Sequence, residues 1–275
     1  MANFRNPAPM GDPASILGNP WKPTASLFGN SSAPFGLPAE TPLSWGLVAN
    51  DPCTLSVLVP LMPPNDVRTD AKLCSLSPMG YKFIYAHEAW KGVSNHLHWP
   101  GGSSGITLGP GYDMGARSAS DITADMKSIG LSDDAAKTVS QAAGMVVKKG
   151  GTYTNADMLK FVKDHHKDVD LNPDQELKLL HHIVPHYEQI VRRSLKVPLA
   201  QHEFDALVSF AYNSAGRWSH VTRLLNGGKA AEAMKVIKAG NTTGGKVSKG
   251  LTHRRADEVK LFMLGKYEMN GQPIS

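Results

Sequence analysis

The sequence predicts a mostly α-helical α+β domain over residues 76–270, with one small β element near its start. Two patterns predict this fold class. After Pro78, apolar residues recur at helical spacing behind capping residues, whereas residues 100–117 are rich in glycine and carry short alternating runs. The hydrophobic fraction of 41% is enough for a packed core.

The helical pattern begins with Ser77-Pro78, a capping residue followed by a first-turn proline. Met79, Phe83, Ala86 and Trp90 then predict an amphipathic helix over residues 78–91. We expect further helices after caps at Ser118, Ser132 and Thr154, a long helix over residues 174–195 kinked at Pro185, and helices over 200–213, 228–239 and 252–264. The lysine- and glycine-rich residues 240–250 predict a mobile surface loop.

Residues 1–75 form a second segment, in which proline and glycine are frequent. Thirteen of the 19 prolines precede residue 80, and proline cannot propagate a helix because it lacks an amide donor. We expect residues 1–50 to be extended or disordered and residues 55–61 to form one strand. The segment could serve docking or export, or it could be an inert tail.

The compartment is constrained by what the sequence lacks. The first residues do not combine a basic start with an apolar core, so no cleaved signal peptide is expected. The longest apolar run, residues 55–62, is far shorter than the roughly 20 residues of a membrane span. Cys53 and Cys74 could pair after export or remain two thiols.

Charge is distributed unevenly along the chain. Residues 191–275 contain 14 Lys and Arg against 6 Asp and Glu, whereas residues 1–190 contain 15 against 18. A cationic C-terminal third suits an extended anionic partner, and both nucleic acid and the bacterial wall fit that description.

Glu88 is the first candidate for chemistry. It lies near the end of the first predicted helix, with Tyr81 and Ile84 on its own face and Trp90 close by. Apolar surroundings raise the pKa of a carboxyl group and keep it available as a proton donor. A single glutamate on a helix is nevertheless more often a solvated surface residue.

Thr107 and Asp113 are the second pair of candidates. Both lie in the glycine-rich residues 105–115, where glycine lets the backbone turn sharply and approach a ligand. Alternatively, the threonine caps a turn and the aspartate forms an Asx-turn in an ordinary hairpin.

Three stretches together resemble a known family. His87-Glu88 followed by residues 104–113 resembles the active-site stretch of the phage-type lysozymes of glycoside hydrolase family 24, and the order of Thr107 before Asp113 is that of the pesticin-type members. Residues 204–213 resemble the buried helix of the family's large lobe, and residues 250–262 its last catalytic-domain helix.

The resemblance implies a two-lobed lysozyme-like fold with a cleft between a β-bearing lobe and a helical lobe. It implies that Glu88 is the general acid, that Asp113 stabilises positive charge and orients a water, and that Thr107 helps to hold this water. If water attacks directly, the anomeric configuration inverts. The family's pattern also implies that Arg254 pairs with Glu88, although Arg254 could be a surface arginine.

Several weaker candidates could contact a substrate in that cleft: Tyr112, Asn213, Arg254, His98 and Trp99, with His96 as a further possibility. Aromatic faces pack well on sugar rings. The histidines include the pair His182 and His186, but the sequence has no HExxH motif or flanking cysteine pair, so no metal and no cofactor are expected.

The resemblance implies a peptidoglycan hydrolase that cuts between N-acetylmuramic acid and N-acetylglucosamine. Such an enzyme could be an antibacterial effector, for example of a type VI secretion system, with an immunity protein and a secretion component as partners, the latter through residues 1–75. It could equally be a phage endolysin. In either case it would act in the periplasm or wall of a target bacterium. A non-catalytic wall-binding module is the alternative, and nucleic-acid binding has only the charge in its favour.

Overall fold

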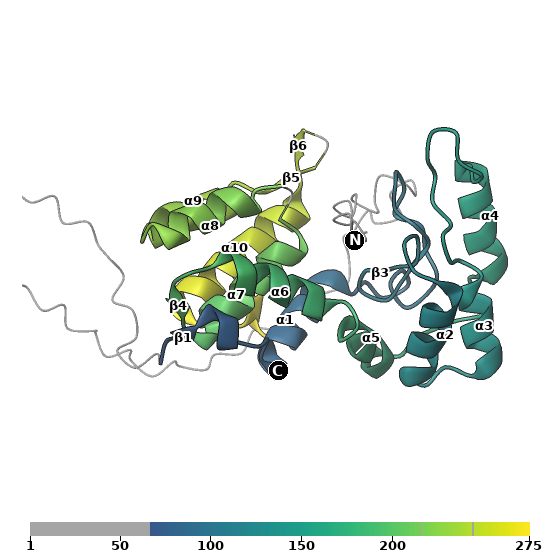
Figure 1. Cartoon of the computed structure of the whole chain (residues 1–275), viewed down its shortest axis with the longest axis horizontal. Coiled ribbons are helices and arrows are strands. Elements are labelled where there is room, and N and C mark those ends of the chain that lie inside the picture. Colours follow the sequence, from purple (N-terminus) through teal and green to yellow (C-terminus); the bar gives the residue numbers. More distant parts are fainter. Residues whose placement is uncertain (1–66, 215, 244) are drawn as a thin grey trace, which may run out of the picture.

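The computed structural model describes residues 67–275 except residues 215 and 244, and these residues form two lobes side by side (Figure 1). The first lobe contains α2, α3 and α4 with the hairpin β2–β3. The second contains α6 to α10 with the small strands around them, and α1 and α5 lie between the two groups. The expected mostly helical α+β fold with a small β element is therefore observed.

Ten α-helices are described. They are α1 (Pro78–Glu88), α2 (Ala119–Ser128), α3 (Asp133–Ser140), α4 (Asn155–His165), α5 (Pro173–Leu180), α6 (Val184–Ser194), α7 (Gln201–Tyr212), α8 (Trp218–Asn226), α9 (Ala230–Lys238) and α10 (Lys249–Leu264). None of them is long and apolar enough to cross a lipid bilayer.

The strands are short and pair only in antiparallel twos. The pairs are β1 (Thr69–Asp70) with β4 (Pro198–Leu199), β2 (Thr107–Leu108) with β3 (Tyr112–Asp113), β5 (Thr242–Thr243) with β6 (Lys246–Val247), and β7 (Glu268–Met269) with β8 (Gln272–Pro273). A short 3₁₀ helix, η2 (Ala71–Leu73), follows β1.

The predicted helix starts are confirmed by their capping bonds. The hydroxyl groups of Ser77, Ser118, Ser132 and Thr154 accept hydrogen bonds from the backbone amides of their own first turns. Each bond satisfies one of the amides that a helix start leaves without a partner. These starts were predictable because every group involved is local in sequence.

The helices differ from the prediction in three places. The first helix ends at Glu88, and Trp90 lies beyond it with 50% of its surface exposed. The expected long helix over 174–195 is two helices, because Pro185 stands in the first turn of α6, where a missing amide costs nothing. The helix α8 was not predicted, and its start has no capping side chain.

The expected loop over residues 240–250 is also different. Residues 242–247 contain the hairpin β5–β6, and α10 already begins at Lys249 behind the cap Ser248. The run of lysine and glycine concealed a two-residue strand pair, which is too short to produce an alternating pattern.

The core of the helical lobe is built around α7. All of its residues from His202 to Tyr212 are buried, and it packs against α10, α6 and α1. Polar side chains occur in this core as well, and Asp205 is fully buried. Its carboxylate accepts hydrogen bonds from the amide and hydroxyl of Ser77, from Gln201 and from Tyr267.

The first described residues pack on this lobe. The strand β1 pairs with β4, and Ala71 is fully buried, so the fold includes residues before the predicted boundary at 76. The thiol of Cys74 is buried and unbonded to sulfur. The expectations for residues 1–50, for a strand over 55–61 and for Cys53 lie outside the described residues.

Candidate active site

Glu88 is the last residue of α1 and is 5% exposed. The start of this helix is fixed by its cap Ser77, which is itself held by Asp205 of α7. Phe83 and Ile84 bury the helix in the core. The sequence therefore places one carboxyl group at the end of a rigid, apolar support.

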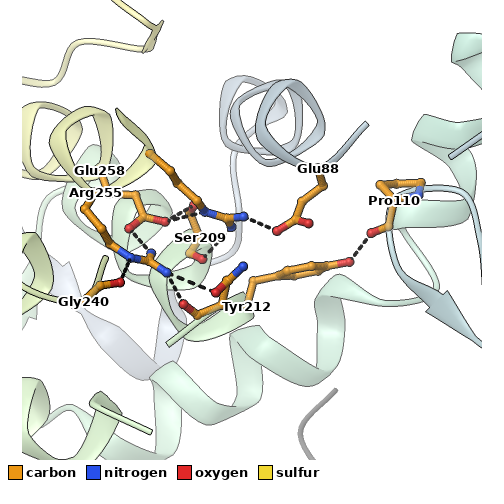
Figure 2. A network of polar contacts seen from close by, with 9 residues as sticks. Glu88, Pro110, Ser209, Tyr212, Gly240, Arg255 and Glu258 are labelled. Carbon is orange, nitrogen blue, oxygen red and sulfur yellow. Dashed lines mark hydrogen bonds and ion pairs between the residues drawn. The ribbon is translucent and has the colours of Figure 1, made fainter. Parts of the chain in front are cut away.

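A network of charged side chains surrounds this carboxyl group (Figure 2). Arg254 of α10 donates through Nη1 to Glu88 Oε1, and its Nε donates to Glu258 Oε1 at 3.0 Å. Arg255 donates to the other oxygen of Glu258 and also contacts Asn213. The ion pair between Arg254 and Glu88 that the family resemblance implied is thus present.

The two glutamates differ in their proton affinity. Burial raises the pKa of Glu88 more than the guanidinium of Arg254 lowers it, so the net direction is upward. Burial also opposes ionisation of Glu258, but Arg255 and Arg254 together outweigh it and hold the pKa of Glu258 low. Because Glu258 is ion-paired with both arginines, Arg254 shares its positive charge between two carboxyl groups. Arg254 therefore lowers the pKa of Glu88 less than it would if Glu88 were its sole partner.

Thr107 and Asp113 face each other across the β2–β3 hairpin as register partners. The carboxylate of Asp113 accepts hydrogen bonds from the amides of Gly105 (3.1 Å) and Gly115 (2.7 Å), and the Thr107 hydroxyl donates to the Gly105 carbonyl at 3.2 Å. The hairpin therefore brings this expected pair together and fixes the orientation of its carboxylate.

The hairpin and Glu88 meet at two tyrosines. Tyr212, the last residue of α7, donates to the carbonyl of Pro110 in the hairpin turn, and Tyr187 of α6 packs on its ring with centroids 4.5 Å apart. Burial raises the pKa of Tyr187, and the negative charges of Glu88 and Asp113 raise it further. Both carboxyl groups thus act on the same phenol.

A pocket of about 730 Å³ opens beside Glu88. Its walls come from the end of α1 and the following residues 90–100, from α4, from the start of α10 and from the β7–β8 hairpin, and the lining combines apolar side chains with polar and charged ones. The expected site residues among them are Glu88, His98, Trp99, Asn213 and Arg254. Thr107, Asp113 and Tyr112 do not line it.

The environment of Tyr112 does not favour the expected contact with a substrate. Tyr112 is fully buried, its hydroxyl donates to Asp125 of α2, and Arg117 stacks over its ring. The alternation of a two-residue strand was too short to show which side chain points inward.

Two histidines of the pocket have unusual environments. Burial lowers the pKa of His98, and burial and Arg254 lower that of His87 to about 4. Among the described residues, the buried Nε2 atoms of both rings have no hydrogen-bond partner. The Nε2 atom of His87 lies 3.7 Å from a carboxylate oxygen of Asp257, so that of His98 is the better candidate for binding a hydroxyl or amide group of a ligand.

Sequence reasoning missed Glu258, Arg255, Tyr187 and Tyr212 as parts of the site. The spacing of Arg254 and Arg255 from Glu258, four and three residues, could have indicated ion pairs on one helix face. No local signal marked the tyrosines. In the described part of the chain, no three potential ligands come together to hold a metal ion.

Comparison with known proteins supports the resemblance over part of the chain. The sequence pattern of the family described as Phage lysozyme matches residues 135–258. The match covers 124 of the 275 residues, which is less than half of the chain. The resemblance to phage-type lysozymes predicted above is confirmed, although the matched residues begin after Glu88 and Asp113.

Individual relatives are endolysins. The endolysin of Bacillus phage PZA is 47% identical over 78 residues, which cover 27% of this chain and 30% of that protein. The endolysin of Bacillus phage B103 is 38% identical over 110 residues, covering 37% and 42%. The matches thus span less than half of either endolysin. Among solved structures, an endolysin from Escherichia coli O157:H7 phage FAHEc1 has a TM-score of 0.45 and 22% identity, and the superposition covers 71% of this chain and 98% of that chain.

Proposed function

We propose that this protein is a muramidase, which hydrolyses the β-1,4 bond between N-acetylmuramic acid and N-acetylglucosamine in peptidoglycan. The observation that carries the proposal is Glu88, a buried carboxyl group with a raised pKa at the edge of a pocket of about 730 Å³. A carboxylic acid that retains its proton near neutral pH can protonate a glycosidic oxygen. The match of residues 135–258 to the Phage lysozyme family supports the same reaction class.

In the proposed reaction, Glu88 gives its proton to the leaving oxygen as the bond from that oxygen to the anomeric carbon breaks. Asp113 stabilises the positive charge on the sugar and orients a water with the help of Thr107. The oxygen of this water bonds to the anomeric carbon, and its proton passes to Asp113. Asp113 then releases this proton to solvent, and Glu88 regains one from solvent. Attack by water inverts the anomeric configuration.

The pocket would hold the sugars next to Glu88. Trp90 and Trp99 offer aromatic faces for sugar rings, and His98 and Asn213 offer polar atoms. The cationic C-terminal third would keep the enzyme on the anionic wall.

Digestion of purified sacculi tests the bond that is cut. Mass spectrometry of the released muropeptides should show N-acetylmuramic acid at the new reducing end, and NMR of fresh product should show the inverted anomer. A new reducing end on N-acetylglucosamine, or no release at all, would contradict the proposal. Tests on chitin oligomers show whether that polymer is also cut.

Glu88→Gln separates an enzyme from a wall-binding module. The variant should still bind sacculi but release no reducing ends, because the amide cannot donate the proton. Equal turnover by parent and variant would exclude Glu88 as the acid. A parent that binds sacculi without hydrolysis would favour the wall-binding alternative.

Two delivery routes fit such an enzyme, and both lead to the wall of a target bacterium. In the first, the protein is an antibacterial effector whose residues 1–75 dock on a secretion component and whose producer makes an immunity protein. In the second, it is an endolysin, as the names of its relatives suggest. Capture of a protein from the producing cell that blocks hydrolysis would support the first route. Lysis that requires a co-expressed holin would support the second.

A further inference from the structure

The hydroxyl group of Tyr212 joins the two lobes next to the proposed active site. Tyr212 ends α7 of the helical lobe, and Pro110 lies 102 residues earlier in the turn between β2 and β3 (Figure 2). The hydroxyl donates a hydrogen bond to the Pro110 carbonyl, and both residues are buried. The charge of Glu88 acts electrostatically on the Tyr212 phenol.

The hairpin turn approaches this phenol more closely than a side chain would allow. Gly111 has φ +108°, and a Cβ atom placed on it would lie 2.7 Å from the Tyr212 hydroxyl oxygen. The neighbouring amide of Gly109 donates to the Ser94 carbonyl at 2.7 Å, which holds the other side of the turn. The turn is therefore fitted to the tyrosine hydroxyl and not merely near it.

The phenol itself is held firmly. Its ring packs on Tyr187 at an interplanar angle of 36°, and α7 is buried against α10 and α6. Burial and the negative charge of Glu88 raise the pKa of Tyr212 well above its usual value. The hydroxyl consequently keeps its proton and remains a donor throughout the pH range in which a lysozyme works.

The two halves of the proposed catalytic apparatus lie on either side of this bond. Thr107 and Asp113 stand on the hairpin strands that flank the turn, whereas Glu88 and Arg254 belong to helices packed around α7. We propose that Tyr212 is a positioning residue that sets the separation of Glu88 from Asp113 through its bond to Pro110. This proposal rests on the muramidase function proposed above.

Tyr212→Phe removes the bond and keeps the ring. We expect kcat on soluble peptidoglycan fragments to fall by about tenfold to a hundredfold with KM nearly unchanged, because a misplaced catalytic group lowers the rate of the bound complex. The matched control is Tyr267→Phe, which removes a 2.7 Å hydrogen bond to Asp205 within the helical lobe. Its kcat should stay within about twofold of the parent even if its melting temperature falls equally. Equal kcat for the two variants would overturn the proposal.

A double-mutant cycle with Gly111→Ala gives a second test. In the parent, the added methyl group meets the Tyr212 hydroxyl oxygen, whereas in Tyr212→Phe that oxygen is gone. The backbone strain from the positive φ is the same in both backgrounds and cancels in the cycle. We expect Gly111→Ala to reduce kcat more in the parent than in Tyr212→Phe, and equal reductions would contradict the proposal.

Hydrogen exchange of the hairpin amides tests the positioning role of Tyr212 without a measurement of enzymatic activity. Amides of residues 105–115 should exchange faster in Tyr212→Phe than in the parent, and Tyr267→Phe should leave them unchanged. Unchanged exchange in Tyr212→Phe overturns the positioning proposal whatever the activity. An inactive parent whose hairpin nevertheless loosens in Tyr212→Phe overturns the proposed function and with it the catalytic meaning of the bond.

Discussion

Two glutamates of one network, Glu88 and Glu258, acquire opposite proton affinities from their partners. Glu258 is fully buried between two arginines and is held ionised, whereas Glu88 shares only Arg254 and has a raised pKa. A pair of carboxyl groups with divergent pKa values is the arrangement from which acid and counter-charge roles can be assigned. If Glu88 is the proton donor, the same residue type serves as an acid in one position and as a fixed negative charge in the other.

The glutamate pair predicts the direction of a pH shift. If Glu88 must be protonated to react, activity falls as pH rises through its pKa. In Glu258→Gln, a negative charge near Glu88 is removed, and Arg254 no longer shares its positive charge with a second carboxylate. Both changes lower the pKa of Glu88. The alkaline limb of the pH profile of kcat/KM should then move to lower pH.

The control for this shift is Glu176→Gln, which alters a buried glutamate bonded to Tyr85 and not to the arginines. It should leave the alkaline limb where it is. Because breaking a buried ion pair costs about 3–5 kcal/mol, both profiles are best measured at low temperature. A limb that stays in place or moves to higher pH in Glu258→Gln would contradict the assignment of Glu88.

His98 offers a test of substrate contact at the same scale. Its buried Nε2 atom has no partner among the described residues and lies in the pocket wall. His98→Ala should raise KM by about threefold to tenfold, the equivalent of one lost hydrogen bond, with little change in kcat. His165→Ala, outside the pocket, serves as the control, and an equal KM for both variants would argue against contact at His98.

At the scale of single residues, the sequence identified those that belong to a recognisable motif. Glu88 and Arg254 were found in this way and are paired, and Thr107 and Asp113 are register partners. The roles of Glu258 and Tyr212 were not predicted, because each depends on a partner that only the folded chain brings near. For the same reason, the buried environment of Tyr112 could not be inferred from two strand residues.

At the scale of elements, the residues at which helices begin were easier to predict than the residues at which they end. A cap such as Ser118 and the amide that it binds lie within one turn, so local sequence specifies them. The break between α5 and α6 and the early end of α1 depend on how the helices pack, which spacing alone does not show. The unpredicted α8 has a periodic face but no cap to mark its start.

The cap of α1 predicts a difference in stability between two serine variants. Ser77 accepts from the Gly80 amide at 2.9 Å and also donates to buried Asp205. Exposed Ser118 caps α2, and its further hydrogen bond is with the exposed hydroxyl of Ser120. Ser77→Ala should cost about 1–2 kcal/mol of unfolding free energy and Ser118→Ala about 0.5–1 kcal/mol. Urea unfolding measures both values. A larger loss for Ser118→Ala would contradict this interpretation of the caps.

At the scale of the molecule, the two lobes differ in charge. Arg223, Lys235 and Lys238 are exposed on α8 and α9 of the helical lobe, while the partners of Arg254 and Arg255 are internal. If the exposed cations hold the wall, their replacement by glutamine should weaken binding to sacculi. Binding of the variant should also depend less on salt than binding of the parent. The comparison runs from about 0.1 M to about 1 M salt, over which the Debye length falls from about 10 Å to about 3 Å.

The control variant replaces three exposed lysines of the other lobe, Lys137, Lys163 and Lys167, and so changes the net charge equally. Co-sedimentation with sacculi at each salt concentration compares the two. Equal binding by both triple variants would show that net charge matters and that the position of the cations does not.

The position of the buried Asp205 predicts where in the chain natural variants can lose activity. A helix of 11 residues is about 16 Å long, and Asp205 anchors the end of α1 opposite Glu88. Loss of the Asp205 carboxylate removes both of its bonds to Ser77 and frees this end of the helix, whereas loss of the Tyr267 hydroxyl leaves both bonds in place. If the protein is the proposed muramidase, natural variants that lose hydrolysis should therefore arise at Asp205 as well as around the pocket, in proteins that still accumulate in the cell.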